Sequence, residues 1–123
     1  MIDSSVRASR DWLGSTRASL LAWWIPRTGI IAGLFMPVGV RAAIWIVSLT
    51  WMGVACILNA QRCGRTHCRY TGPFYLAMIL PVLVLGAVGA STGLAEWIAL
   101  GVLIEVGGRL LWWATERAWG TFQ

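Results

Sequence analysis

The sequence contains no lysine and few charges of either sign. Charged residues make up 12% of its 123 positions, against about 25% in a typical soluble domain. A soluble domain of this size has too much surface to be covered by so few charges. Hydrophobic residues make up 58% of the chain, which excludes a disordered polar protein. The composition therefore predicts an integral membrane protein.

Several catalytic signatures are also missing. The sequence has one histidine, His67, and it has no Ser/His/Asp set, no paired carboxylates and no phosphate-binding loop. Hydrolytic chemistry is therefore not expected. The net charge of +5 comes from ten arginines against five acidic residues. The arginines flank hydrophobic runs, a placement that indicates membrane topology and not nucleic-acid binding.

Four hydrophobic stretches are long enough to cross a bilayer. They cover residues 20–38, 42–60, 73–90 and 94–114, and each would reach about 27–32 Å as a helix. With four crossings, seven arginines fall on the side of the termini: Arg7, Arg10, Arg17, Arg62, Arg65, Arg69 and Arg117. Only Arg41 falls on the other side, whereas three crossings would divide the arginines five to four.

The positive-inside rule therefore favours four crossings of the cell (inner) membrane, with both termini in the cytoplasm. The fold class expected is all-α, an integral membrane four-helix bundle.

Residues 1–19 predict an amphipathic helix on the cytoplasmic membrane surface. Trp12 and Leu13 lie on its apolar side, and Arg10 and Asp11 lie on its charged side. The alternative for this segment is a frayed tail. The expected domains are this interfacial helix, 1–19, and a transmembrane domain, 20–123.

The three cysteines and the histidine fall in one short segment, residues 56–73. If the second span stays helical through its cytoplasmic end, Cys56, Cys63 and His67 lie within about 40° of one another on one helix face. Asn59 lies beside this stripe. An odd number of cysteines, two of them in an Arg-rich loop, is not a secreted disulfide framework.

Gly64 is a plausible helix terminator in this segment. A turn there would bring Cys63, His67 and Cys68 together instead. The sequence Thr71-Gly72-Pro73 then predicts the start of the next helix, with Pro73 at its first position.

Thiolates and an imidazole together suit a soft or borderline cation such as Hg(II), Cu(I) or Zn(II). We therefore expect Cys56, Cys63, His67 and Cys68 to bind or transport such an ion at the cytoplasmic end of the second span. Two alternatives stay open. One is a thiol–disulfide redox protein that uses Cys63 and Cys68, and the other is a non-catalytic membrane subunit or assembly factor.

Three arginines surround these thiols: Arg62, Arg65 and Arg69. Their positive charge favours the thiolate forms of Cys63 and Cys68. They are also expected to contact anionic lipids on the cytoplasmic face. A bundle of four spans leaves little interior for a complete pathway, so we expect a homo-oligomer.

Charged residues also fall inside the predicted spans. Glu105 and Arg109 are four residues apart and can pair on one helix face. Arg27 and Glu105 lie at similar depths, about 10 and 13 Å from the cytoplasmic ends of their spans. We therefore predict a polar cavity that opens to the cytoplasm and is lined by Arg27, Cys56, Asn59, Glu105 and Arg109. The alternative is a purely structural Glu105–Arg109 pair near the interface, with Arg109 extended toward the membrane surface.

Residues 63–73 (CGRTHCRYTGP), preceded by Asn59 and Ala60, resemble a loop found in small multi-pass membrane proteins of prokaryotes that are largely uncharacterised. The match covers roughly residues 56–76. It implies a multi-pass membrane protein and no established activity. In size, and in having thiols at a helix end, the chain also loosely resembles the small mercury-resistance membrane transporters. Those carry a vicinal Cys-Cys pair in a span, and this sequence has none.

Overall fold

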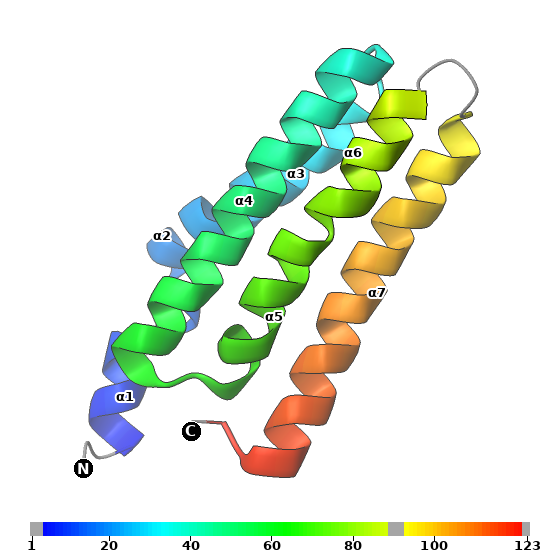
Figure 1. Ribbon diagram of the computed structural model, residues 1–123. Helices are drawn as coiled ribbons and strands as arrows, with labels where there is room; N and C mark the ends of the chain where they lie inside the picture. Colours follow the sequence, from blue (N-terminus) through cyan, green and yellow to red (C-terminus); the bar gives the residue numbers. More distant parts are fainter. Residues whose placement is uncertain (1–3, 89–92, 122–123) are drawn as a thin grey trace.

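The computed structural model describes residues 4–88 and 93–121, and the chain is all-helical there, as predicted. The elements, in order, are α1 (Ser4–Arg10), a 3-10 turn η1 (Trp12–Gly14), α2 (Thr16–Ser19), a π-helical segment η2 (Leu20–Trp24), α3 (Ile25–Gly33), α4 (Val38–Cys63), α5 (Thr66–Ala77), α6 (Ile79–Val88) and α7 (Leu94–Trp119). Together they form four long helical segments. The first combines η2 and α3, the second is α4, the third combines α5 and α6, and the fourth is α7. Figure 1 shows both ends of the chain beside the α4–α5 turn, at one end of the bundle.

Two of these segments are long and apolar enough to cross a bilayer, namely Val38–Cys63 and Thr66–Val88. They include the predicted second span and most of the third, whose residues 89 and 90 lie outside the described part. Length and composition alone are weak evidence for a membrane, because a buried core helix passes the same test. The second segment is interrupted at Met78, where Pro81 lacks the N–H that would bond to the carbonyl of Ala77.

The single amphipathic helix predicted over residues 1–19 is not observed in residues 4–19, where α1, η1 and α2 form three short pieces. Asp11 and Ser15 break the helix because their side chains cap the next element. Asp11 Oδ1 accepts the N–H of Leu13 at 3.0 Å, and Ser15 Oγ accepts the N–H of Ala18 at 3.4 Å. Asp11, which the helical wheel assigned to the charged outer side, is buried.

The turn after α4 follows the prediction at Gly64 but not at Pro73. Gly64 has a φ of 74° and ends α4, and its N–H bonds to the carbonyl of Ala60 at 2.7 Å. The next helix already begins at Thr66, so Pro73 lies inside α5. Because α5 starts early, the side chains at helical spacing along one of its faces, among them Cys68 and Thr71, are buried by packing against α4. Tertiary packing therefore outweighs the local preference for starting a helix at proline.

Two glycines allow α4 and α5 to approach closely. A Cβ atom on Gly72 would lie 2.7 Å from Ile57 Cγ1 and 3.1 Å from the carbonyl oxygen of Gly53. A Cβ atom on Gly53 would lie 2.8 Å from the side chain of Leu76. Small residues at such a crossing let two helix backbones pack against each other. The next turn of each helix carries a cysteine, so the crossing also determines how far apart these thiols lie.

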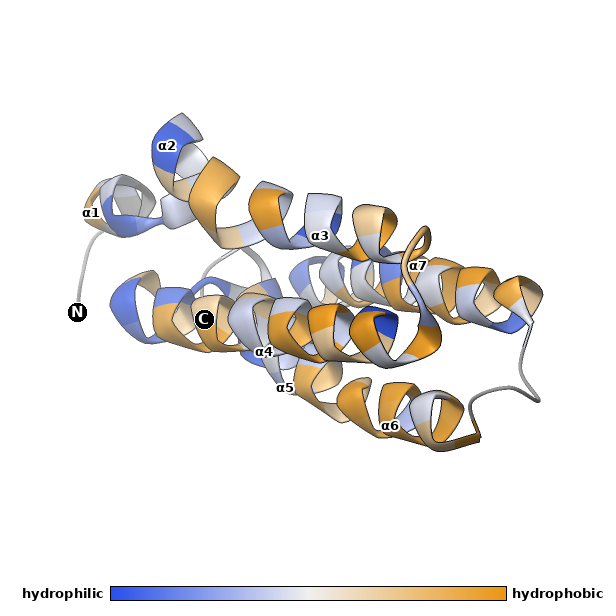
Figure 2. Ribbon diagram, turned by 90° about the horizontal axis from the view of Figure 1, so that it is seen from above, coloured by the Kyte–Doolittle hydropathy of each residue, from blue (hydrophilic) through white to orange (hydrophobic). Residues whose placement is uncertain are grey.

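The outer faces of the long helices are apolar, as Figure 2 shows by colour. Large hydrophobic side chains are exposed on α4, α6 and α7, among them Val47, Val54, Leu58, Leu80, Leu83, Val84, Val102, Leu103, Val106 and Leu110. Buried polar side chains include Asp11, Asn59, Thr66 and His67. Large exposed apolar patches are rare on soluble monomers.

We expect Gly72→Ala to lower the free energy of unfolding by about 1–3 kcal/mol, because the added methyl group forces α4 and α5 apart. Unfolding in detergent, followed by circular dichroism, measures this loss. Gly39→Ala is the matched control, since nothing lies within 4 Å of a Cβ atom at that position. Equal stability of the two variants would contradict the close crossing.

Candidate thiol site

The four residues predicted as ligands are all buried at the same end of the bundle. The exposed fractions of Cys56, Cys63, His67 and Cys68 are 1%, 3%, 3% and 0%. Cys56 and Cys63 lie on α4, and His67 and Cys68 lie on α5. His67 is therefore not on the helical stripe of Cys56 and Cys63, because Gly64 reverses the chain before it.

The thiols of Cys56 and Cys68 are neighbours that interact across the two helices. Cys56 Sγ also accepts hydrogen bonds from Trp23 Nε1 at 3.2 Å and from Thr71 Oγ1 at 3.6 Å. Cys68 Sγ accepts one from Asn59 Nδ2 at 3.4 Å. Cys56 Sγ thus has two polar donors beside it within a buried site, an arrangement that stabilises a thiolate at Cys56.

Cys63 has a different environment. Its Sγ donates to the backbone carbonyl of Asn59 at 3.2 Å and lies 3.8 Å from Asn59 Oδ1. The redox alternative drawn from the spacing paired Cys63 with Cys68, whereas the thiol that interacts with Cys68 is Cys56. The antiparallel return of α5 along α4 explains this difference, since it brings Cys68 level with Asn59 and Cys56.

His67 connects Cys68 to a carboxylate on α7. His67 Nε2 lies 3.4 Å from Cys68 Sγ, and His67 Nδ1 lies 3.0 Å from Glu116 Oε1. The imidazole stacks on Trp112 with ring centroids 4.0 Å apart and an angle of 8° between the planes. A carboxylate at Nδ1 keeps the proton on that nitrogen and leaves Nε2 free to accept the thiol proton. The arrangement therefore places an imidazole nitrogen next to the Cys68 thiol.

Arg65 joins three parts of the chain above this site. Its Nη1 donates to Asp11 Oδ2 at 2.7 Å, and its Nε donates to Glu116 Oε1 at 2.6 Å. The remaining oxygen of Asp11 accepts from Asn59 Nδ2 at 2.8 Å. Asn59 Oδ1 in turn accepts the backbone N–H of Trp12 at 2.9 Å. The N-terminal segment, the α4–α5 turn and α7 are thus held by one network of charged hydrogen bonds.

The two ionised partners in this network shift each other's pKa. Burial acts to lower the pKa of Arg65, but the carboxylates of Glu116 and Asp11 outweigh it and raise that pKa. Burial acts to raise the pKa of Glu116, but the hydrogen bonds from Arg65 and His67 outweigh it and lower that pKa. Both groups are therefore held in their charged forms.

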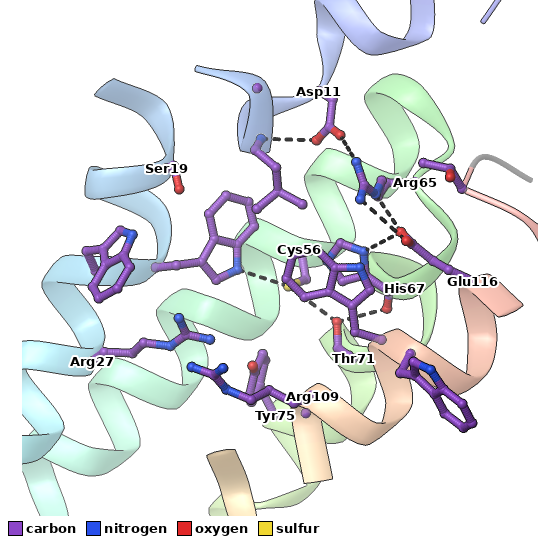
Figure 3. Close-up of a pocket in the computed structure, with 18 of the residues that line it drawn as sticks. Asp11, Ser19, Arg27, Cys56, Arg65, His67, Thr71, Tyr75, Arg109 and Glu116 are labelled. Atoms are coloured by element: carbon purple, nitrogen blue, oxygen red, sulfur yellow. Dashed lines mark hydrogen bonds and ion pairs between the residues drawn. The ribbon is translucent and has the colours of Figure 1, made fainter. Parts of the chain in front are cut away.

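A cavity of about 1200 Å³ lies beside the thiols, and Cys56, His67 and Thr71 form part of its wall (Figure 3). Of the five predicted lining residues, Arg27, Cys56 and Arg109 line it. Asn59 is fully buried beneath Asp11. Glu105 lies behind the two arginines, 3.5 Å from Arg27 Nε and 3.0 Å from Arg109 Nε.

The sequence did not identify the charged partners of the thiol site. Asp11 and Glu116 are 105 residues apart, and no spacing rule relates them to His67 or to each other. The one feature of the sequence that could have indicated them is the scarcity of acidic residues. They are two of only five acidic residues, and they occur near the ends of the chain that a four-span topology brings to the same side.

Within residues 4–88 and 93–121, no three His, Cys, Asp or Glu side chains form a group that could hold a metal ion. The four predicted ligands therefore do not form one closed site, since Cys63 is turned to Asn59. No protein-family model, curated protein or solved structure matches the chain. The function is accordingly argued from the geometry of the site.

We expect Glu116→Gln to lower the free energy of unfolding at pH 7 by about 1–3 kcal/mol, because Arg65 and His67 lose a charged acceptor. The pKa of Glu116 is lowered from its ordinary value of 4.5 in the folded chain. Its contribution is therefore fully present above that value and is lost as the pH falls further. Unfolding measured from pH 7 to pH 3 should show the wild type and the variant converging. A constant difference at all pH values would contradict this role.

Proposed function

We propose that the chain is a four-span membrane protein in which Cys56 and Cys68 form a redox-active thiol pair. The observation that carries the proposal is the pairing of two buried, neighbouring thiols from different helices beside a cavity that Cys56 lines. Cys56 faces the cavity, and Cys68 lies behind it with its own base, His67. The two thiols thus occupy positions suited to different steps of one reaction.

The membrane part of the proposal is supported by the distribution of polar and apolar side chains. The long helices expose valine and leucine outward, while charged hydrogen bonds lie inside one end of the bundle. Both ends of the chain lie with the arginine-rich α4–α5 turn (Figure 1). By the positive-inside rule this end faces the cytoplasm of the cell (inner) membrane. The exposed Arg62 and Arg69 would contact anionic lipids there.

The proposed reaction is thiol–disulfide exchange with a small external disulfide. The thiolate of Cys56 attacks one sulfur of that disulfide and forms a mixed disulfide, and the displaced thiolate takes up the proton lost by Cys56. His67 Nε2 accepts the proton of Cys68, whose sulfur then attacks Cys56 Sγ. A second thiolate leaves and receives the proton from His67. The products are a Cys56–Cys68 disulfide and two external thiols, so two electrons and two protons pass to the substrate.

Glu116 and Trp112 would act as positioning residues in this scheme. Glu116 fixes the tautomer of His67, and Trp112 holds the plane of its ring. Neither residue contacts a sulfur atom in the hydrogen bonds described above. Their substitution should therefore slow the second step, which consumes the mixed disulfide, and leave mixed-disulfide formation at Cys56 comparatively unaffected.

We expect oxidation to consume two thiols in the wild type and in Cys63→Ser, but to give no internal disulfide in Cys56→Ser or Cys68→Ser. Cys63→Ser is the matched control because the Cys63 sulfur is turned to Asn59. Carbonate-washed membranes are treated with an oxidised small disulfide, and free thiols are counted by alkylation and mass spectrometry. Loss of the disulfide in Cys63→Ser, or removal of the chain by the wash, would contradict the proposal. Full cellular function with all three cysteines replaced by serine would favour a non-catalytic subunit or assembly factor.

A soft metal ion is the second candidate substrate, because the thiols of Cys56 and Cys68 are neighbours and His67 Nε2 lies 3.4 Å from Cys68 Sγ. Two thiolates suit Hg(II) or Cu(I), which accept few ligands, better than Zn(II), which takes four. The cavity would then lead such an ion to the sulfur pair. A homo-oligomer would supply the pathway that a single small bundle has little room to enclose.

Under this second reading we expect one Hg(II) or Cu(I) per chain in the reduced wild type and in Cys63→Ser. Cys56→Ser and Cys68→Ser should each lose at least about tenfold in affinity, since one of two thiolate ligands is gone. Competition dialysis with metal analysis measures both quantities. Equal, substoichiometric metal in all four proteins would eliminate this candidate.

A further inference from the structure

The cavity beside Cys56 has an excess of positive charge. Four arginines and two carboxylates line it: Arg27, Arg65, Arg109, Arg117, Asp11 and Glu116. Arg65 is bound to both of those carboxylates. Arg27 and Arg109 share a single acidic neighbour, Glu105, which lies outside the lining. Two guanidinium groups therefore border the part of the cavity below Cys56, and one carboxylate offsets part of their charge.

These two guanidinium groups point into the same space. Figure 3 shows Arg27 and Arg109 directed toward each other on one side of the cavity, next to Tyr75 and below Cys56. Arg27 and Tyr75 line the same cavity. The Arg27 Nε atom is buried and forms an ion pair with Glu105 at 3.5 Å, but it makes no hydrogen bond among the described residues. A ligand or water in the cavity can satisfy such a donor.

The walls of the cavity limit what can reach the sulfur. Cys56 is 1% exposed, so the disulfide of a folded protein would not reach it. The space of about 1200 Å³ instead accommodates a small molecule. Trp23, Trp24 and Trp112 supply apolar surface along its sides. The occupant is therefore small, with an anionic group at one end and enough carbon surface to lie along these rings.

We infer that the substrate is a low-molecular-weight disulfide that carries carboxylate groups. This inference rests on the proposed thiol exchange and names its substrate class. Arg27 and Arg109 bind one carboxylate, because guanidinium groups pair with carboxylates through parallel hydrogen bonds. Tyr75 borders the same carboxylate site. The bound carboxylate brings the disulfide bond to Cys56 Sγ, which then reacts in the exchange given above.

The test compares three disulfides that differ in charge: dithiodiglycolate with two negative charges, neutral hydroxyethyl disulfide and cystamine with two positive charges. The rate of mixed-disulfide formation at Cys56 is measured by mass spectrometry in Cys68→Ser, which cannot complete the second step. Each rate is divided by the rate of the same disulfide with a free cysteine peptide. The experiment is run at low ionic strength, where surface charges are least screened.

We expect the normalised rate for dithiodiglycolate to exceed that for cystamine by at least about tenfold, as two charge-assisted contacts imply. Adding Arg27→Gln and Arg109→Gln should reduce this ratio to within about twofold. Arg109→Gln alone is the second variant, since that side chain is 71% exposed and its loss does not threaten the fold. Arg10→Gln, on the exposed surface of α1, is the control and should keep the ratio.

The outcomes separate the two proposals. If all three disulfides react with Cys56 at similar normalised rates, or if the ratio survives in the arginine variants, the substrate class is wrong while the exchange reaction stands. If none of them reacts with Cys56 faster than with the free peptide, both the exchange reaction and the substrate class are wrong. A preference for cystamine would overturn the charge argument directly.

Discussion

The contact between Gly53 and Gly72 is the constraint on which the thiol site depends. A side chain on either glycine would meet the backbone or a side chain of the opposite helix within about 3 Å. Only at this separation can the thiols of Cys56 and Cys68, one turn away on each helix, interact. The turn at Gly64 then sets the register between the helices. The proximity of the two sulfurs therefore follows from backbone geometry, and the polar groups around them act on a pair that the helices already hold together.

Arg65 connects this hairpin to the rest of the molecule. A single guanidinium group bonds to carboxylates from the N-terminal segment and from α7, so neither carboxylate is left buried without a partner. Removing one member would leave the others uncompensated, and this makes the network sensitive to acid. The same carboxylate of Glu116 fixes the tautomer of His67. The hydrogen bonds that stabilise this end of the bundle are therefore the same ones that orient His67, the base proposed for Cys68.

Local and periodic features of the sequence predicted much of this structure. Helical content, the helix end at Gly64 and the Glu105–Arg109 pair depend on spacing within one segment, and each is observed. Asp11 was placed on the wrong side of a helix, since its hydrogen bonds with Asn59 and Arg65 join residues about 50 positions apart. A helical wheel contains no information on such pairs. The start of α5 was misplaced for a related reason, because the packing that stabilises it comes from α4.

The two sulfurs differ in the groups that surround them, and this difference gives the proposed reaction a direction. Cys56 is next to the cavity, Arg27 and Tyr75, so a substrate anchored by its carboxylate meets Cys56 first. Cys68 is fully buried and in contact with His67, so it can lose a proton without exposure to the cavity contents. A pair with identical surroundings would react at either sulfur. Here the positive charge is on the side of the proposed attacking thiol and the imidazole is on the side of the proposed resolving thiol, so the proposed exchange would begin at Cys56 and end at Cys68.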